Sequence, residues 1–283
     1  MKSFDTESIK LLSGYGKSLE DAKFFGLDAS AWTSGDTTNS KGYQLKFHDD
    51  ELILEKEWPY VVNDCYLDSD GNTFFRTEQQ NLIINGTGKS KTEIICPAET
   101  ETGPLSFYGS LDDDDFCVVT ASSEYLFCRK NGQWTKTPLP EEADGVNSSI
   151  VLSPKTTLLA TAEGFIRWDG SSFKMFAGVE DEIYSLTLVS KGKLLAVGSE
   201  GVYTWTLKNS WKKLRGPFES YCIGNAKSKG SILIPSSEGV VKFDLSTEKL
   251  KKISDYSCVQ VIAFAEHQAI ALGSDSGYQL LKF

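Results

Sequence analysis

Several features that define common protein classes are missing from this sequence. No run of about 18 apolar residues occurs, so no membrane-spanning helix is expected. The first residues, MKSFDTESIK, lack the apolar segment of a signal peptide. Helical periodicity is almost absent, and the one short candidate is SLEDAK at residues 18–23. The chain has 29 Lys and Arg against 39 Asp and Glu, a net charge of −10. We therefore expect it to bind neither nucleic acid nor an anionic membrane surface.

Cysteine and histidine are too sparse and too scattered to suggest a metal site. The two histidines, His48 and His267, have no third ligand at a fixed spacing. The six cysteines form no CxxC pair, and they are Cys65, Cys96, Cys117, Cys128, Cys222 and Cys258. We expect buried free thiols in a reducing compartment, the cytoplasm, the nucleus or both. No metal or other cofactor is predicted.

Motifs for catalysis or phosphate binding are incomplete wherever they begin. INGTGKS at residues 84–90 is similar to a phosphate-binding loop, but the first glycine is missing and no helix is expected to follow. DSDGN at residues 68–72 is similar to half of a calcium loop and lacks the later ligands. No Gly-x-Ser-x-Gly elbow is present. These segments predict turns between strands, and no catalytic residue is assigned.

An internal repeat of short strands dominates the sequence. Four segments, beginning at Thr157, Lys193, Ser231 and Ala269, share an apolar strand, a small or acidic turn and a strand opened by glycine. The strand-opening positions along the whole chain are Gly42, Asn81, Glu124, Gly164, Gly201, Gly239 and Gly277. Their successive gaps are 39, 43, 40, 37, 38 and 38 residues. A period near forty with short strands is typical of a β-propeller, with one four-stranded blade per repeat.

The repeat predicts an all-β fold: one seven-bladed β-propeller of antiparallel strands that fills residues 1–283 and is monomeric. The expected blades are approximately residues 20–58, 59–98, 102–140, 143–178, 179–216, 217–254, and 255–283 together with 7–14. The last repeat ends after its third strand, and Glu7–Gly14 (ESIKLLSG) is similar to fourth strands such as FKMFAG at Phe173. We expect this N-terminal strand to join the last blade and close the ring.

The repeat core resembles that of the WD40-like propellers. SPKTTLLATAEGFIRWDG at residues 153–170 includes the dipeptide Trp168-Asp169, and its counterparts are Trp205-Thr206 and Phe243-Asp244. The Gly-His dipeptide that opens a WD repeat is missing, so the family's Asp–His–Ser/Thr–Trp network is not carried over. The resemblance covers residues 145–283 well and the first half only by spacing. A weaker resemblance is to RCC1-like propellers, through LLSGYGK, LIINGTGK and AFAEHQAIAL.

Glutamates before the strand-opening glycines are the most regular polar feature. Glu163, Glu200 and Glu238 occupy this position in three successive repeats. In a WD-type ring these turns share one rim, so the three carboxylates would form an acidic arc for a basic segment of a partner protein. Aromatic residues and arginine are common at the centre of interfaces. Four such residues are predicted in loops between blades on the same rim: Trp58, Tyr60, Arg215 and Phe218.

The resemblances imply three functions. A WD40-like propeller implies a non-catalytic platform for protein–protein interaction, as a subunit of a larger intracellular complex. An RCC1-like propeller implies a regulatory protein that binds a small partner protein, as relatives in tRNA wobble-uridine modification do. The third is a propeller enzyme with its active site in the central channel. Because propellers host many unrelated activities, the fold does not choose among these three.

Overall fold

Every element described in this chain is a β-strand. The computed structural model describes residues 8–28, 40–48, 51–67, 73–77, 81–84, 90–92, 104–108, 116–120, 125–131, 133–139, 148–153, 156–161, 164–169, 171–176, 179, 181–190, 192–206, 210–218, 220–222, 226–273 and 277–283. Within these ranges no helix is long and apolar enough to span a membrane.

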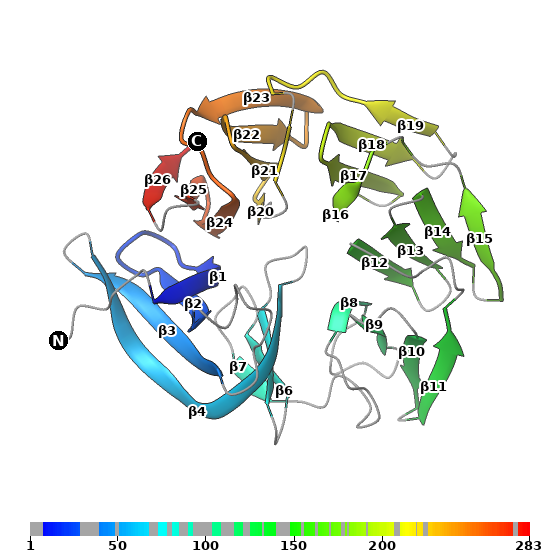
Figure 1. Ribbon diagram of the computed structural model, residues 1–283, viewed down its shortest axis with the longest axis horizontal. Coiled ribbons are helices and arrows are strands. Elements are labelled where there is room, and N and C mark those ends of the chain that lie inside the picture. The colour runs from blue at the N-terminus through cyan, green and yellow to red at the C-terminus, as the bar shows by residue number, and fades with distance from the viewer. Residues whose placement is uncertain are drawn as a thin grey trace. The chain divides into compact units, whose positions relative to one another are not determined.

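The strands form successive antiparallel sheets, and within each sheet neighbours in space are neighbours in the chain (Figure 1). The first sheet consists of β1 (Ile9–Tyr15), β2 (Lys23–Asp28), β3 (Ser40–His48), β4 (Glu51–Leu67), β5 (Thr73–Thr77), β6 (Asn81–Ile84) and β7 (Ser90–Thr92). The next two sheets consist of β8 (Pro104–Tyr108), β9 (Phe116–Thr120), β10 (Tyr125–Lys130) and β11 (Gln133–Pro138), and of β12 (Ser148–Ser153), β13 (Thr156–Thr161), β14 (Gly164–Trp168) and β15 (Phe173–Phe176).

Two further sheets of four strands and one of three complete the described fold. They consist of β16 (Ile183–Ser190), β17 (Lys193–Gly198), β18 (Val202–Thr206) and β19 (Ser210–Lys213), of β20 (Ala226–Ser228), β21 (Ser231–Ser236), β22 (Gly239–Asp244) and β23 (Lys249–Ser254), and of β24 (Gln260–Ala265), β25 (Gln268–Leu272) and β26 (Tyr278–Lys282). An all-β chain built from four-stranded antiparallel sheets is consistent with a β-propeller. The number of blades and the closure of a ring stay predictions.

Central and outer strands differ in their side chains as their positions require. β21 (SILIPS) is buried at every residue, and β17 (KLLAVG) is buried after its first lysine. The fourth strand β23 (KLKKIS) is mostly exposed or half-buried. Strands covered on both faces need continuous apolar runs, whereas edge strands carry charge, especially lysine, that discourages pairing with other chains.

The Trp-Asp-type dipeptides have a local structural role at the turn into the fourth strand. The Asp169 carboxylate accepts hydrogen bonds from the backbone N–H groups of Ser171 at 3.0 Å and Ser172 at 2.9 Å. Asp244 does the same with Ser246 at 3.0 Å and Thr247 at 2.8 Å. Such bonds favour the charged carboxylate, so they hold the pKa of both carboxyls well below its usual range.

The predicted strand-opening positions are accurate in most repeats. Gly164, Gly239 and Asn81 are the first residues of β14, β22 and β6. Gly201 and Gly277 immediately precede β18 and β26. Gly42 instead lies inside β3, so the marker is displaced there.

The predicted boundary at residues 58–59 is wrong, because β4 continues through it. The strand pairs with β3 through residues 51–62 and with β5 through residues 62–67. The register shifts where Gly42 faces residues 58–60, and this bulge accommodates Pro59, which cannot donate to the ladder. Trp58 and Tyr60 therefore lie in a strand, not in a loop. Trp58 is 7% exposed, and a Cβ at Gly42 would lie 2.9 Å from its ring.

The sequence predicted that the N-terminal strand is the fourth strand of the last sheet, but β1 pairs in the first sheet instead. β1 pairs with β2, from Ile9 opposite Asp28 to Tyr15 opposite Lys23, while the last sheet contains only β24, β25 and β26 among the described residues. The reason lies in the side chains: Ile9, Leu11 and Leu12 are all buried. An apolar pattern on both faces suits an inner strand, not an exposed outer one.

The described strands group into two compact units, Met1–Glu93 with Gly224–Phe283, and Ile94–Ile223. In the first unit the first and last sheets pack together. The rings of Phe24 and Phe264 meet edge to face at 5.4 Å, and the Gln260 side chain donates a hydrogen bond to the Leu12 carbonyl at 3.4 Å. The second unit has its own core around Trp205, Phe165 and Leu194. A single domain over residues 1–283 stays a prediction.

The cysteines are not all free thiols. Cys128 is disulfide-bonded, which corrects the expectation for this residue. Cys117 is the residue directly opposite Cys128 in the pairing of β9 with β10. Cys222 and Cys258 are not disulfide-bonded, as expected, although only Cys258 is buried and Cys222 is half-buried.

Candidate binding pocket

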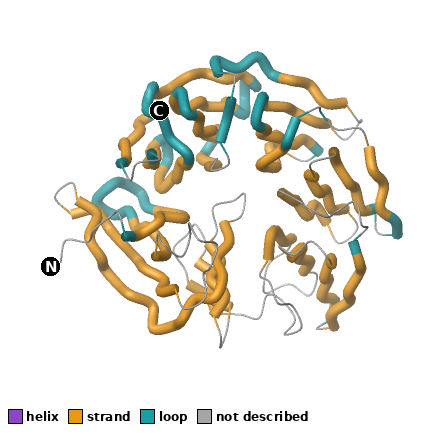
Figure 2. The backbone as a smooth tube through the Cα atoms, in the orientation of Figure 1, coloured by secondary structure: helices purple, strands orange, loops and turns teal. Residues whose placement is uncertain are grey.

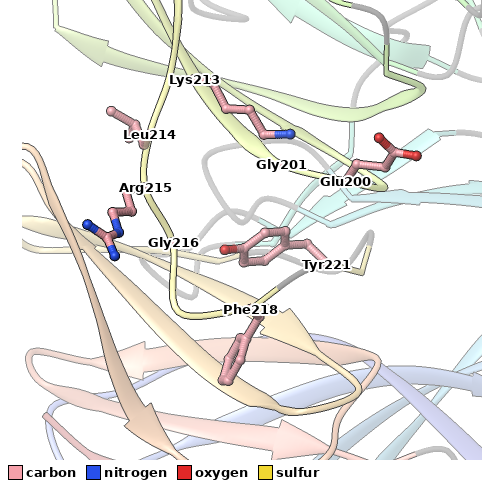
Figure 3. Close-up of a pocket in the computed structure, with 8 residues that line it drawn as sticks. All are labelled: Glu200, Gly201, Lys213, Leu214, Arg215, Gly216, Phe218 and Tyr221. Carbon is pink, nitrogen blue, oxygen red and sulfur yellow. The ribbon is translucent and has the colours of Figure 1, made fainter.

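A pocket of about 670 Å³ lies at one end of the sheet β16–β19, in the unit Ile94–Ile223. Its lining comes from the turn between β17 and β18, from the end of β19 and from the loop that follows β19. Figure 3 shows these residues, which are Glu200, Gly201, Lys213, Leu214, Arg215, Gly216, Phe218 and Tyr221.

The turn between β17 and β18 is held by a single carboxylate. Asp181, just before β16, accepts hydrogen bonds from the Ser199 hydroxyl at 2.7 Å and from the Glu200 backbone N–H at 3.1 Å. The Tyr203 hydroxyl donates a third bond to Asp181 at 2.9 Å. Burial first, and then the bond to Asp181 and its charge, raise the pKa of Tyr203 above its usual range. The phenol therefore remains a donor, and it fixes the backbone that presents Glu200.

Gly201 makes room for the side chains beside this turn. A Cβ there would lie 2.7 Å from Cε of Lys213 and 2.9 Å from the Tyr203 hydroxyl. The Lys213 ammonium lies 5.6 Å from the centre of the Tyr203 ring, within the range of a cation–π contact. The glycine thus allows the lysine stem to lie across the turn and place its charge in the pocket.

Figure 2 draws the described part of the loop after β19 in the colour of loops and turns, and two backbone hydrogen bonds hold this loop. The Leu214 N–H donates to the Val202 carbonyl at 2.8 Å, and the Tyr221 N–H donates to the Ser199 carbonyl at 3.2 Å. Tyr221 is buried, Phe218 is 9% exposed, and their ring centres are 6.4 Å apart. The aromatic side of the pocket is therefore formed before any ligand arrives.

Charges of both signs line the pocket. Glu200 and Arg215 are exposed, as is Lys213. Figure 3 shows Glu200 and Lys213 near one another and Arg215 on the far side of the pocket. The Tyr221 ring lies between Arg215 and the other two charged residues in this view. Within the described part of the chain, neither Lys213 nor Arg215 makes an ion pair. Both cations are thus available to an incoming carboxylate, and Glu200 is available to a cation or an N–H donor.

The structure brings together three of the seven predicted site residues: Glu200, Arg215 and Phe218. Glu238 is exposed in the turn between β21 and β22, which belongs to the other unit. Glu163 lies outside the described residues, so the acidic arc stays a prediction. Trp58 is buried in β4, and the side chain of Tyr60 also lies outside the described part.

Five of the eight lining residues were not among the predicted site residues, and two of them, Lys213 and Tyr221, supply a charge and an aromatic ring. Lys213 lies in the lysine-rich fourth strand, where its neighbours Trp211 and Lys212 suggested only an exposed edge. Tyr221 gave no signal in the sequence, because its place depends on how the loop folds back to Ser199. The regular glutamate before Gly201 was the feature that did locate this end of the sheet.

Neither histidine lines this pocket. His48 ends β3, and His267 lies in the turn between β24 and β25. His267 is 3.6 Å from the Glu266 carboxylate, which also pairs with Lys229 at 3.1 Å. Among the described residues no group of three or more His, Cys, Asp or Glu is placed to hold a metal ion.

Known proteins resemble this chain in fold and not in sequence. No protein-family model matches it, and no curated protein is similar to it in sequence. Three solved structures are similar. One is a catalytically inactive virginiamycin B lyase from Staphylococcus aureus with quinupristin, with a TM-score of 0.62 and 10% identity over 100% of this chain and 98% of that chain.

The second is YCF48 bound to the D1 peptide, with a TM-score of 0.58 and 11% identity over 97% of this chain and 92% of that chain. The third is U3-55K, with a TM-score of 0.56 and 12% identity over 93% of this chain and 90% of that chain. All three are β-propeller-type folds, which supports that fold class here. Because one of them is an enzyme, the shared fold does not decide whether this chain is one.

Proposed function

We propose that this chain is a non-catalytic propeller that holds a segment of a partner protein in the pocket at the end of β16–β19. The carrying observation is a pocket whose backbone is held by hydrogen bonds and whose charged side chains make no ion pair with any other described residue. Preorganisation lowers the entropy lost on binding. A propeller-type structure with a bound peptide, YCF48, supports this use of the fold. The proposed setting is a larger intracellular assembly, in the cytoplasm or the nucleus.

The charges favour a segment of mixed charge over a purely basic one. Lys213 and Arg215 would repel a basic segment, whereas an acidic residue could bond to both. Glu200 then suits a basic residue or an N–H donor farther along the segment. Phe218 and Tyr221 supply the apolar contact between these two ends. Glu200 keeps the role predicted for it, while the contribution of Glu163 and Glu238 stays open to test.

A peptide selection tests this proposal. Short random peptides are selected against the full chain, and the affinity of the enriched peptides is measured for the wild type and for Arg215→Glu and Lys213→Glu. We expect enriched peptides to contain an acidic residue near an aromatic one, and each variant to lose about tenfold in affinity, the equivalent of about 1.4 kcal/mol. Lys174→Glu, an exposed lysine on the outer strand β15 of the same unit, is the matched control.

Two outcomes would contradict the proposal. One is enriched peptides that bind Arg215→Glu and the wild type equally well. The other is a set of purely basic peptides that lose affinity in Glu200→Gln, which would restore the acidic arc in place of the mixed-charge pocket.

A further inference from the structure

The last sheet has no fourth strand among the described residues. β24, β25 and β26 form a three-stranded sheet, whereas each of the four sheets immediately before it has four strands. Among the described residues, β26 pairs with β25 alone. One edge of β26 is therefore available for another strand.

The backbone groups at this edge can be identified from the register. At the two ends of the β25–β26 ladder, Phe283 donates its N–H to the His267 carbonyl at 3.1 Å, and Gly273 donates to the Gly277 carbonyl at 2.8 Å. Residues of an antiparallel strand direct their backbone groups alternately to the two sides. Gln279 and Leu281 thus bond to β25, and Leu280 and Lys282 direct their N–H and C=O groups outward.

Leu280 breaks the pattern of the repeat. Its counterparts in β14, β18 and β22 are Arg167, Thr204 and Lys242, which face lysines on the fourth strands. Leu280 is instead apolar and 38% exposed, which makes it one of the most exposed large apolar side chains described. A position that is polar in these three repeats is apolar in β26, which no described fourth strand covers.

A small pocket lies beside Leu280. It measures about 280 Å³, and its apolar lining includes Leu19, Phe264 and Leu280. Glu20 and Lys282 also line it. All of these residues belong to one unit, so the pocket is formed within a single body. An apolar side chain on an added strand opposite Leu280 would point to this side of the sheet.

The complete sheets indicate what an added strand should present on the other side. Opposite the third-strand residues Trp168, Trp205 and Phe243, their fourth strands place Phe173, Trp211 and Leu250. Leu281 is the equivalent residue in β26. The missing strand should therefore carry an aromatic or large aliphatic residue opposite Leu281.

We propose that the outer edge of β26 is a docking site for an extended segment of a partner protein, which adds to the sheet as an antiparallel fourth strand. Along that segment, an acidic residue pairs with Lys282, an aromatic residue covers Leu281 and an aliphatic residue enters the pocket beside Leu280. Main-chain hydrogen bonds supply affinity, and the alternating side chains supply specificity. This surface shares no residue with the pocket at Arg215.

Amide hydrogen exchange of the full chain tests whether the edge is open. We expect the Leu280 and Lys282 amides to exchange fast in the free chain, while Gln279 and Leu281 exchange slowly. The synthetic peptide Ser-Glu-Trp-Leu-Thr-Thr should slow the first pair. Slow exchange of Leu280 and Lys282 without peptide would show that the edge is already covered and would overturn the proposal. A dimer in solution that protects this pair would assign the edge to a second copy and would also overturn it.

Peptide affinity tests the side-chain assignment. We expect Leu280→Lys to weaken the peptide at least about tenfold, while scrambling the peptide has a similar effect. Met175→Lys replaces an exposed apolar residue on the outer strand β15 and is the matched control, with unchanged affinity expected. Arg215→Glu should also leave the affinity for this peptide unchanged. The two docking proposals are therefore tested independently of one another. Equal binding by Leu280→Lys and the wild type would refute the proposed strand.

Discussion

The sheets β16–β19 and β24–β26 begin alike and end differently. Both have buried central strands, and both open their third strand just after a glycine. In the first sheet Trp205 is 2% exposed, and Trp211 of the fourth strand stacks on it at 5.8 Å. In the second sheet no described strand follows β26, and Leu280 is 38% exposed, whereas its counterpart in β18, Thr204, is 6% exposed. The difference teaches that the fourth strand covers the Leu280 position of a third strand, while the neighbouring core position, Leu281 at 6% exposed, is buried without it.

Removing an inner strand should lower the free energy of unfolding more than any other change considered. Deleting residues 1–14 removes most of β1 from the first sheet. The first sheet would then have an uncovered edge at β2, as the last sheet has at β26. The loss should be about 5 kcal/mol or more, since three buried aliphatic side chains are each worth about 1.5–3 kcal/mol. That is comparable with the total stability of many domains, so we expect insolubility or a very low melting temperature.

The gentler variant Leu12→Ala keeps this prediction open to refutation if the deletion does not fold. Leu12 is buried, and we expect a loss of about 2–5 kcal/mol in denaturant unfolding. A deletion protein that melts within a degree or two of the full chain would show that β1 contributes little to the fold.

Removing the cover of a third strand should have the next largest effect. Trp211→Ala takes away the ring that stacks on Phe165 at 4.2 Å and on Trp205 at 5.8 Å. Because Trp211 is half-buried, we expect a loss near the lower end of the range for such changes, about 2–3 kcal/mol. Denaturant unfolding measures it, and Trp205 emission should shift to the red. A loss as small as that of an exposed residue would break the comparison between the two sheets.

Removing the hydrogen bond that fixes the pocket turn should lower the free energy of unfolding by a smaller amount. Tyr203→Phe removes the donor to Asp181 and should cost about 1.5–3 kcal/mol, the usual range for a bond to a charged group. Because the folded pKa of Tyr203 is raised, its contribution is complete below its ordinary pKa of 10.0 and is lost as pH rises toward the folded value. The difference between the wild type and Tyr203→Phe should therefore shrink above pH 10.0. A difference that stays constant with pH would contradict this assignment.

A change at the open edge should have the smallest effect. Leu280→Ser in the free chain should alter the free energy of unfolding by less than about 0.5 kcal/mol, as is usual for exposed positions. A serine at a core position of β18, in Trp205→Ser, should by contrast be severely destabilising. If Leu280→Ser costs as much as a core substitution, then the edge is covered in the free chain, and the two sheets are more alike than described.

Repetition made much of the fold predictable. The glycine spacing located the third strands of the later repeats. In two of them the glycine allows a close approach, by Lys213 at Gly201 and by Tyr256 at Gly277. It also located Glu200 and hence one end of the pocket. Asn81 and Glu124 opened or preceded strands as expected even without a glycine, since the period itself carried the information.

Predictions failed where neighbours in space decide the outcome. ESIKLLSG reads as an outer strand by analogy, but its burial depends on packing against β24. Trp58 beside Pro59 reads as a loop, but a bulge opposite Gly42 lets the strand continue. Phe218 lies in a loop, as predicted, but the sequence does not show that this loop folds back and brings the ring beside Tyr221. None of these contacts leaves a local pattern in the sequence.

The continuous strand β4 has a consequence for how the first sheet unfolds. It belongs at once to the ladder with β3 and to the ladder with β5, which elsewhere would be two sheets joined by a loop. Opening either ladder therefore disturbs a strand that the other needs. Residues 9–92 should behave in native-state exchange as one cooperative foldon, while sheets joined by loops can open one at a time.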